Sequence, residues 1–82
     1  KISVAASELS TEDQQLFETL RILRAQLAKE QNVPPYVIFP DKTLTEMALV
    51  KPHTPGQMLD ISGVGQTKLD RYGEDFLNEI RQ

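Results

Sequence analysis

The chain has 82 residues and a formal net charge of −3, a length that supports one small domain with a single core. It contains no cysteine and one histidine, His53, which excludes a disulfide framework, a thiolate metal site and a histidine-cluster metal site. Its longest apolar runs have four residues, far short of a membrane span, and no signal-peptide pattern opens it. Because the first residue is Lys, we expect a module cut from a larger protein.

The charge is unevenly distributed along the chain. Residues 19–55 hold five basic and three acidic side chains, a net +2. Residues 1–18 hold one basic and four acidic side chains, and residues 56–82 hold three basic and five acidic ones. Exposed helix faces commonly carry mixed charges, but this distribution is compatible with a small electropositive patch on an otherwise acidic domain.

The chain is expected to begin with a linker, which a helical domain follows. Residues 1–9 show no helical period, and we interpret them as a linker preceding a domain at residues 10–82. Either Ser10 or Thr11 can cap a helix, and Thr11 with Gln14 fits a capping box.

An apolar stripe predicts the first and longest helix. Four leucines recur at spacings of four, three and four, as on one face of an amphipathic helix: Leu16, Leu20, Leu23 and Leu27. Acidic residues lie at the start of this segment and basic ones further along, which suits the helix dipole. We expect the helix to end near Asn32, directly before two prolines.

The stretch from Val33 to Asp41 contains three prolines and the apolar run from Tyr36 to Phe39. Its β-branched and aromatic residues are compatible with a strand. However, the chain offers no second strand, and an isolated strand leaves its backbone groups without partners. We therefore expect a single helical turn or a tight loop, with Val37, Ile38 and Phe39 partly buried.

The remainder predicts further helices. Asp41 is expected to cap a second helix that ends before Pro52 and turns three residues inward: Leu44, Met47 and Ala48. Thr54-Pro55-Gly56-Gln57 combines a threonine cap with proline at the first helical position, and this short helix carries Met58, Leu59 and Ile61.

A sharp turn at Ser62-Gly63-Val64-Gly65 leads to another short helix, which bears Lys68, Leu69 and Tyr72. Gly73 should end or bend this helix before the last one begins at Glu74. The cap signals together predict an all-α fold, a small bundle of about five helices with a helix-hairpin-helix-like turn.

Residues that could support catalysis are scarce. His53 follows a proline in a loop, where a solvated histidine is the ordinary interpretation. Asp70, Glu74 and Asp75 are typical of a solvated helix face, and no carboxylate cluster has metal-ligand spacing. We therefore expect this domain to have no enzyme activity, catalytic residue, metal or cofactor of its own.

The first candidate binding site is Tyr36 with its basic neighbours. Single-stranded nucleic acid is bound by bases stacking on aromatic rings while cations meet the phosphates. The cations that could converge near Tyr36 are Arg24, Lys29, Lys42 and Lys51. In the alternative, Tyr36 covers the core and Lys42 is ordinary solvated surface, while Arg24 pairs with a carboxylate at the edge of the core.

The second candidate site is the glycine turn with Lys68. A Gly-apolar-Gly turn followed by a lysine-bearing helix resembles the helix-hairpin-helix element, in which free backbone amides face a DNA phosphate. Gly63 and Gly65 would give the turn its freedom. In the alternative, the two glycines only allow neighbouring helices to pack closely.

These motifs, in this order, resemble the HRDC (helicase and ribonuclease D C-terminal) domain, most of all that of bacterial RecQ DNA helicases. A tryptophan that many family members carry in the first helix is absent, and Ile22 or Leu23 occupies that region. The resemblance covers about residues 10–82 and rests on Leu20-Arg21 with Arg24, Pro34-Pro35, Ile38-Phe39-Pro40-Asp41, Thr43-Leu44, Pro52, Met58-Leu59, Ile61-Ser62-Gly63-Val64-Gly65, Lys68 and Tyr72-Gly73.

The resemblance implies an accessory DNA-binding module of a 3′-to-5′ ATP-dependent helicase acting in recombination and repair. ATP and Mg would be bound only by the motor elsewhere in the parent chain. The expected partners are single-stranded or partial-duplex DNA and other domains of the parent. We expect a monomer in the bacterial cytoplasm, associated with the nucleoid and not with a membrane. Two alternatives remain, a protein-interaction module and the RNA-binding domain of a ribonuclease D-type exonuclease.

Overall fold

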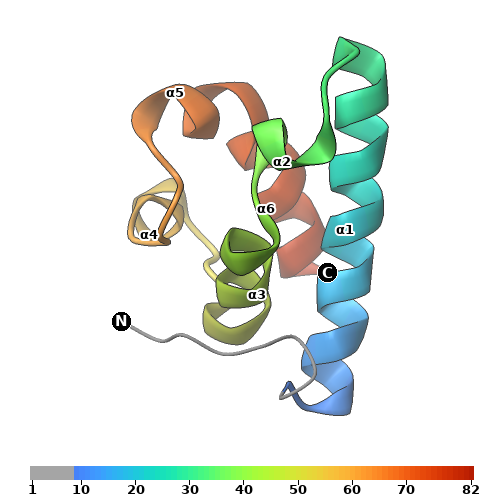
Figure 1. Ribbon diagram of the computed structural model, residues 1–82. Coiled ribbons are helices and arrows are strands. Elements are labelled where there is room, and N and C mark those ends of the chain that lie inside the picture. Colours follow the sequence, from blue (N-terminus) through green and yellow to red (C-terminus); the bar gives the residue numbers. More distant parts are fainter. Residues whose placement is uncertain (1–8) are drawn as a thin grey trace.

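The structure, a computed structural model, describes residues 9–82, so the predicted linker lies outside the described residues except for Leu9. These residues form helices and connecting loops without a strand (Figure 1), which confirms the predicted all-α class. Within them no helix is both long and apolar enough to cross a membrane. The elements are α1 (Thr11–Gln31), α2 (Pro35–Ile38), α3 (Asp41–Val50), α4 (Pro55–Leu59), α5 (Gln66–Lys68), the π-helical turn η2 (Leu69–Gly73) and α6 (Glu74–Arg81).

Local signals set both ends of α1. The Ser10 side chain accepts a hydrogen bond from the Asp13 amide at 3.2 Å, which makes Ser10 the N-cap. The Gln14 side-chain amide donates to the Leu9 carbonyl at 3.0 Å. At the other end Asn32 adopts the left-handed conformation with φ 58°, a common helix terminator. The start near Ser10 and the end near Asn32 are confirmed.

The proline-rich stretch contains one helical turn, α2, as expected. Ile38 and Phe39 have no exposed surface, whereas Val37 is 38% exposed and Tyr36 is 68% exposed. The apolar run is thus divided, with its second half in the core and its first half on the surface.

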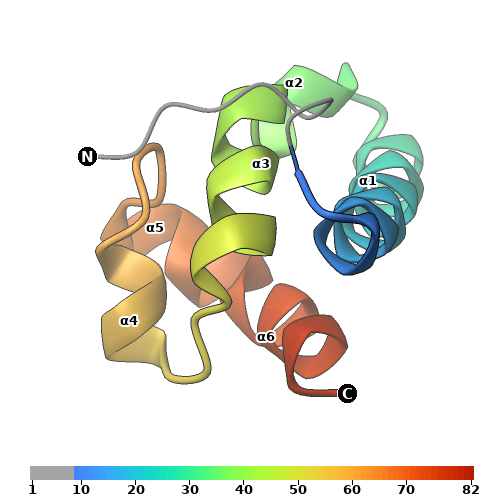
Figure 2. The same cartoon turned by 90° about the horizontal axis from the view of Figure 1, so that it is seen from below.

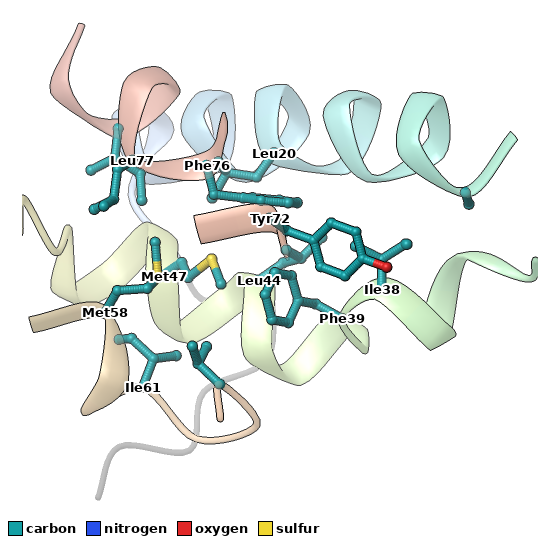
Figure 3. Packing of buried hydrophobic residues seen from close by; sticks show 13 residues of the cluster. Leu20, Ile38, Phe39, Leu44, Met47, Met58, Ile61, Tyr72, Phe76 and Leu77 are labelled. Carbon is teal, nitrogen blue, oxygen red and sulfur yellow. The ribbon is translucent and has the colours of Figure 1, made fainter. Parts of the chain in front are cut away.

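Phe39 occupies the centre of the core, which Figure 3 shows from close by. Its ring meets the Phe76 ring edge to face at 5.0 Å between centroids and the Tyr72 ring at 6.1 Å, a favourable arrangement for aromatic pairs. The other residues of this cluster come from five helices and from the turn between α4 and α5: Leu20, Ala28, Ile38, Leu44, Met47, Met58, Ile61, Val64, Leu77 and Ile80.

Helix α3 packs against α1 and crosses it, since Figure 2 shows α1 nearly end-on and α3 from the side. Leu44, Met47 and Ala48 are fully buried, as predicted. The N-cap of α3, however, is Pro40, without a side-chain cap bond, and Asp41 is the first helical residue. The prediction that Asp41 caps this helix is therefore wrong, and its carboxylate pairs with Arg24 instead.

The C-terminal segments follow their predicted order. The Thr54 hydroxyl accepts a hydrogen bond from the Gln57 amide at 3.1 Å and caps α4. From Gln66 to Arg81 the chain remains helical through α5, η2 and α6. Gly73 does not end the helix, since it closes the π-helical turn η2 and lies buried against Leu69. The absence of a Cβ at this position allows the contact with Leu69.

Candidate nucleic-acid interface

Tyr36 and Lys42 lie on the surface on either side of the buried Phe39. The Tyr36 side chain is 68% exposed, so the alternative in which its ring covers the core does not hold. Lys42 is exposed in the first turn of α3, where an ammonium is mildly disfavoured by the helix dipole and an anion is favoured. The structure therefore presents an aromatic ring and a cation close together in the chain, both accessible to a ligand.

Arg24 is not an exposed cation. The residue is 8% exposed, and its Nη1 donates to the Phe39 carbonyl at 3.0 Å and lies 2.6 Å from Asp41 Oδ1. This arrangement matches the alternative interpretation, in which Arg24 pairs with a carboxylate at the edge of the core. The burial of Arg24 contradicts the prediction that it is a cation freely accessible to phosphates beside Tyr36.

The two predicted lysines differ in position. Lys29 is exposed in the last turn of α1, the end of the helix from which the chain turns into α2. Lys51 follows the last residue of α3, at the opposite end of that helix from Lys42, and pairs with Asp13 at the start of α1. The expectation that Lys51 converges near Tyr36 is therefore wrong.

The glycine turn is fixed to α3 by two polar contacts. Thr43 donates its hydroxyl to the Ser62 carbonyl at 2.9 Å, and the buried Glu46 carboxylate accepts from the Ser62 amide at 3.1 Å. Gly63 has φ +90°, and a Cβ there would lie 2.3 Å from the Thr43 hydroxyl oxygen. Close packing against α3 thus requires Gly63, whereas no atom lies within 4 Å of a Cβ built at Gly65.

Lys68 joins the second candidate site to the first. Its Nζ lies 5.7 Å from the centroid of the Phe39 ring, a distance typical of a cation–π contact. Since Phe39 directly precedes the start of α3 and Thr43 holds the glycine turn, both candidate sites adjoin the N-terminal turn of α3. The sequence did not reveal this proximity, because it depends on contacts between residues far apart in the chain, Phe39 with Lys68 and Thr43 with Ser62.

Thr43 and Glu46 were not predicted to contribute to either site. They lie three residues apart on α3, and both are buried. Their helical spacing beside the core face of α3 was the only sequence signal that could have indicated a role in the site. Elsewhere, His53 is exposed, and its Nδ1 lies 2.7 Å from the Lys51 carbonyl. No group of three metal-ligating side chains occurs among residues 9–82.

Comparison with known proteins identifies relatives. The chain is 47% identical over 70 residues to the ATP-dependent DNA helicase RecQ of Pasteurella multocida, covering 85% of this chain and 11% of that protein. It is 48% identical over 71 residues to RecQ of Bacillus subtilis, covering 87% and 12%. It is also 42% identical over 69 residues to the ATP-dependent DNA helicase UvrD2 of Mycobacterium tuberculosis, covering 84% and 10%. The chain thus spans about a tenth of the length of these relatives.

A solved structure and a family model give the same assignment. The fold matches D. radiodurans RecQ HRDC domain 3 with a TM-score of 0.83 and 32% identity, covering 87% of this chain and 93% of that one. The family model of the HRDC domain matches residues 13–80. The chain therefore belongs to the HRDC domain family, with relatives among the RecQ-type helicases.

Proposed function

We propose that this domain is the accessory nucleic-acid-binding module of a RecQ-type ATP-dependent 3′-to-5′ DNA helicase. It binds single-stranded or partly single-stranded DNA and helps to select substrates in recombination and repair at the bacterial nucleoid. The RecQ relatives support this parent over a ribonuclease D-type exonuclease. The UvrD2 relative is compatible with a second kind of parent protein, a UvrD2-type helicase. ATP and Mg are assigned to the motor in the rest of the parent chain.

The exposed ring of Tyr36 is the observation that carries this proposal. A tyrosine 68% exposed beside a buried aromatic core lacks a packing role for its ring, and base stacking on such a ring is tolerant of sequence. Lys42 and Lys29 are the exposed cations available to phosphates near the neighbouring helix ends. Because so few cations are available, affinity should be modest and should fall steeply with salt.

Fluorescence anisotropy with a labelled oligonucleotide tests the stacking role. Tyr36→Ala should raise the Kd for single-stranded DNA by about fivefold or more, since a stacked base contributes roughly 1–3 kcal/mol. The neighbouring Val37→Ala is the matched control, because Val37 is also exposed but has no ring. Equal binding by wild type and Tyr36→Ala, with both folded, would remove the stacking role.

The lysines distinguish the two candidate sites. Lys42→Ala should weaken binding and lower the slope of log K against log salt by about 0.7, the value for one phosphate contact on a single strand. A larger loss in Lys68→Ala would instead make the glycine turn the main contact. An amide chemical-shift map with a short single strand shows directly which face binds.

A shallow hollow beside α1 favours a second function, docking to protein. Ile22 is 56% exposed and lines a hollow of about 240 Å³ together with Thr19, Leu23, Gln26 and Glu79. An apolar side chain surrounded by polar ones has the composition of a small protein contact. If the domain docks onto other parts of its parent, adding the helicase motor should change the amide chemical shift of Ile22 and not that of Tyr36. The substitution Ile22→Ser should abolish this change.

A further inference from the structure

The first turn of α3 has two backbone amides without a hydrogen-bond partner among residues 9–82. The helix has ten residues, and its N-cap, Pro40, has no side chain that could cap it. The Pro40 carbonyl accepts from the Thr43 amide at 3.0 Å and from the Leu44 amide at 3.2 Å. The preceding amides, of Asp41 and Lys42, have no intrahelical acceptor, as expected for a helix start. Such a start favours an anion.

A buried guanidinium reaches the same turn from α1. Arg24 is 8% exposed, and its Nη1 bonds to the Phe39 carbonyl and the Asp41 carboxylate. Its Nε is buried and has no hydrogen-bond partner among the described residues. A buried donor without a partner is uncommon and costs free energy. The positive group at this helix start therefore has unused hydrogen-bonding capacity.

The two members of the ion pair differ greatly in exposure. The Arg24 side chain is 9% exposed, whereas that of Asp41 is 75% exposed. The carboxylate therefore lies on the solvent side of the guanidinium, over the start of α3. Removal of this one side chain would leave the Arg24 Nη1 with the Phe39 carbonyl as its one partner among residues 9–82.

We infer that Arg24, the amides of Asp41 and Lys42, and the Lys42 ammonium form a phosphate site, and that in the free domain the Asp41 carboxylate takes the place of the phosphate on Arg24. The ligand is a phosphate group of the nucleic-acid backbone, which displaces the carboxylate. This inference rests on the proposed function and adds to it the route of the strand, from the Tyr36 ring to the start of α3. It also assigns Asp41 the role of a competitor within the domain.

A phosphodiester can replace the Asp41 carboxylate on the same donor groups. A phosphodiester presents charged oxygens to guanidinium and amide donors as a carboxylate does, and arginine binds both kinds of group. The displaced Asp41 side chain moves into water, which its exposure allows. Its charge then remains close to the bound phosphate and opposes binding. Neutralising Asp41 should therefore strengthen binding, an outcome that a purely structural ion pair does not predict.

Asp41→Asn provides the test, because asparagine keeps the shape and an oxygen acceptor for Arg24 but loses the charge. Asp75→Asn is the matched control, since Asp75 is an exposed acid in the first turn of α6 and its replacement changes the net charge equally. Binding of single-stranded DNA is measured by anisotropy. Binding of inorganic phosphate is followed through the amide shifts of residues 41 and 42. Circular dichroism checks that each variant is folded.

The expected result is a Kd for DNA that is lower by about threefold or more in Asp41→Asn, from the usual size of charge effects at a helix start. Phosphate should saturate the shifts of residues 41 and 42 at a lower concentration than in wild type, and Asp75→Asn should change neither quantity. Adding Arg24→Lys to Asp41→Asn should abolish the gain, because lysine lacks the guanidinium fork.

If Asp41→Asn changes DNA affinity no more than Asp75→Asn does, the inference is overturned, while a Tyr36-dependent affinity leaves the proposed function in place. If neither wild type nor Asp41→Asn binds DNA, the proposed function is overturned and this inference with it.

Discussion

The two ends of α3 are each tied to α1 by an ion pair, but the pairs are opposite in construction. At the N-terminal end the cation is buried and the acid exposed, with side-chain exposures of 9% for Arg24 and 75% for Asp41. At the C-terminal end the acid is the less exposed partner, at 14% for Asp13 against 42% for Lys51. Asp13 lies early in α1 and Arg24 later, so the two ends of α3 are tied to different stretches of α1.

This difference separates a supporting contact from a candidate binding contact. Asp13 and Lys51 join the start of α1 to the end of α3 and have no exposed aromatic residue beside them in the chain. Arg24 contacts the Phe39 carbonyl and the Asp41 carboxylate, Asp41 directly precedes Lys42, and Thr43 binds the glycine turn at the same end. The N-terminal end of α3 thus adjoins both the buried aromatic cluster and exposed ligand groups. Substitutions at the two ends of α3 should show whether stability and binding depend on different ends.

The largest effect is expected for Phe39→Ala. Phe39 is fully buried and its ring contacts the Phe76 and Tyr72 rings, and truncation of such a residue costs about 3–5 kcal/mol of unfolding free energy. Val50→Ala, at the other end of α3 where Val50 is 48% exposed, should change stability by less than about 0.5 kcal/mol. Urea denaturation measures both. Similar losses in the two variants would contradict the proposed difference between the ends.

The glycine turn gives a second, smaller contrast. Gly63→Ala places a methyl group 2.3 Å from the Thr43 hydroxyl at φ +90°, so it should lower the unfolding free energy by about 2 kcal/mol through backbone strain and loss of the Thr43–Ser62 bond. Gly65→Ala should cost less than about 0.5 kcal/mol, because its surroundings are open. Thermal unfolding of both variants is the measurement. A tolerated Gly63→Ala would show that the turn is not clamped by α3.

The local features of this fold were predictable from the sequence. Ser10, Asn32 and Thr54 mark helix ends through bonds to residues at most four positions away, and such bonds leave a sequence signature. The burial of Ile38 and Phe39 followed from their apolar character and the lack of a partner strand. The resemblance to the HRDC domain, which the comparisons confirm, rested on other short motifs, among them Ile38-Phe39-Pro40-Asp41 and Ile61-Ser62-Gly63-Val64-Gly65.

The long-range contacts were not predictable in the same way. Lys51 meets Asp13 across 38 positions, and no periodic pattern specifies such a pair. A carboxylate partner for Arg24 was foreseen as an alternative, but Asp41 was assigned to helix capping because an aspartate after a proline fits that role equally well. Each candidate site residue was recognisable by chemical type, whereas its burial and neighbours depended on how α1 and α3 pack.

The smallest expected effect concerns pH and the C-terminal end of α3. The Lys51 ammonium holds the pKa of the Asp13 carboxyl below its ordinary value of 3.8. A carboxyl with a lowered pKa in the folded state stabilises the protein above its unfolded-state pKa, and this contribution is lost as pH falls through the folded-state pKa. Lys51→Met should therefore destabilise the domain near neutral pH, and the difference from wild type should shrink between about pH 5 and about pH 3.

Urea midpoints measured across that pH range test this expectation, and Arg21→Met provides the matched control. The Arg21 guanidinium lowers the pKa of Glu18 in the same direction, but both side chains of that pair are about half exposed, so its pH-dependent contribution should be the smaller of the two. Methionine at position 51 retains an unbranched side chain at φ 55°, which keeps the backbone cost unchanged. A Lys51→Met difference that stays constant with pH would assign the effect of Lys51 to packing of its stem and not to the Asp13 carboxylate.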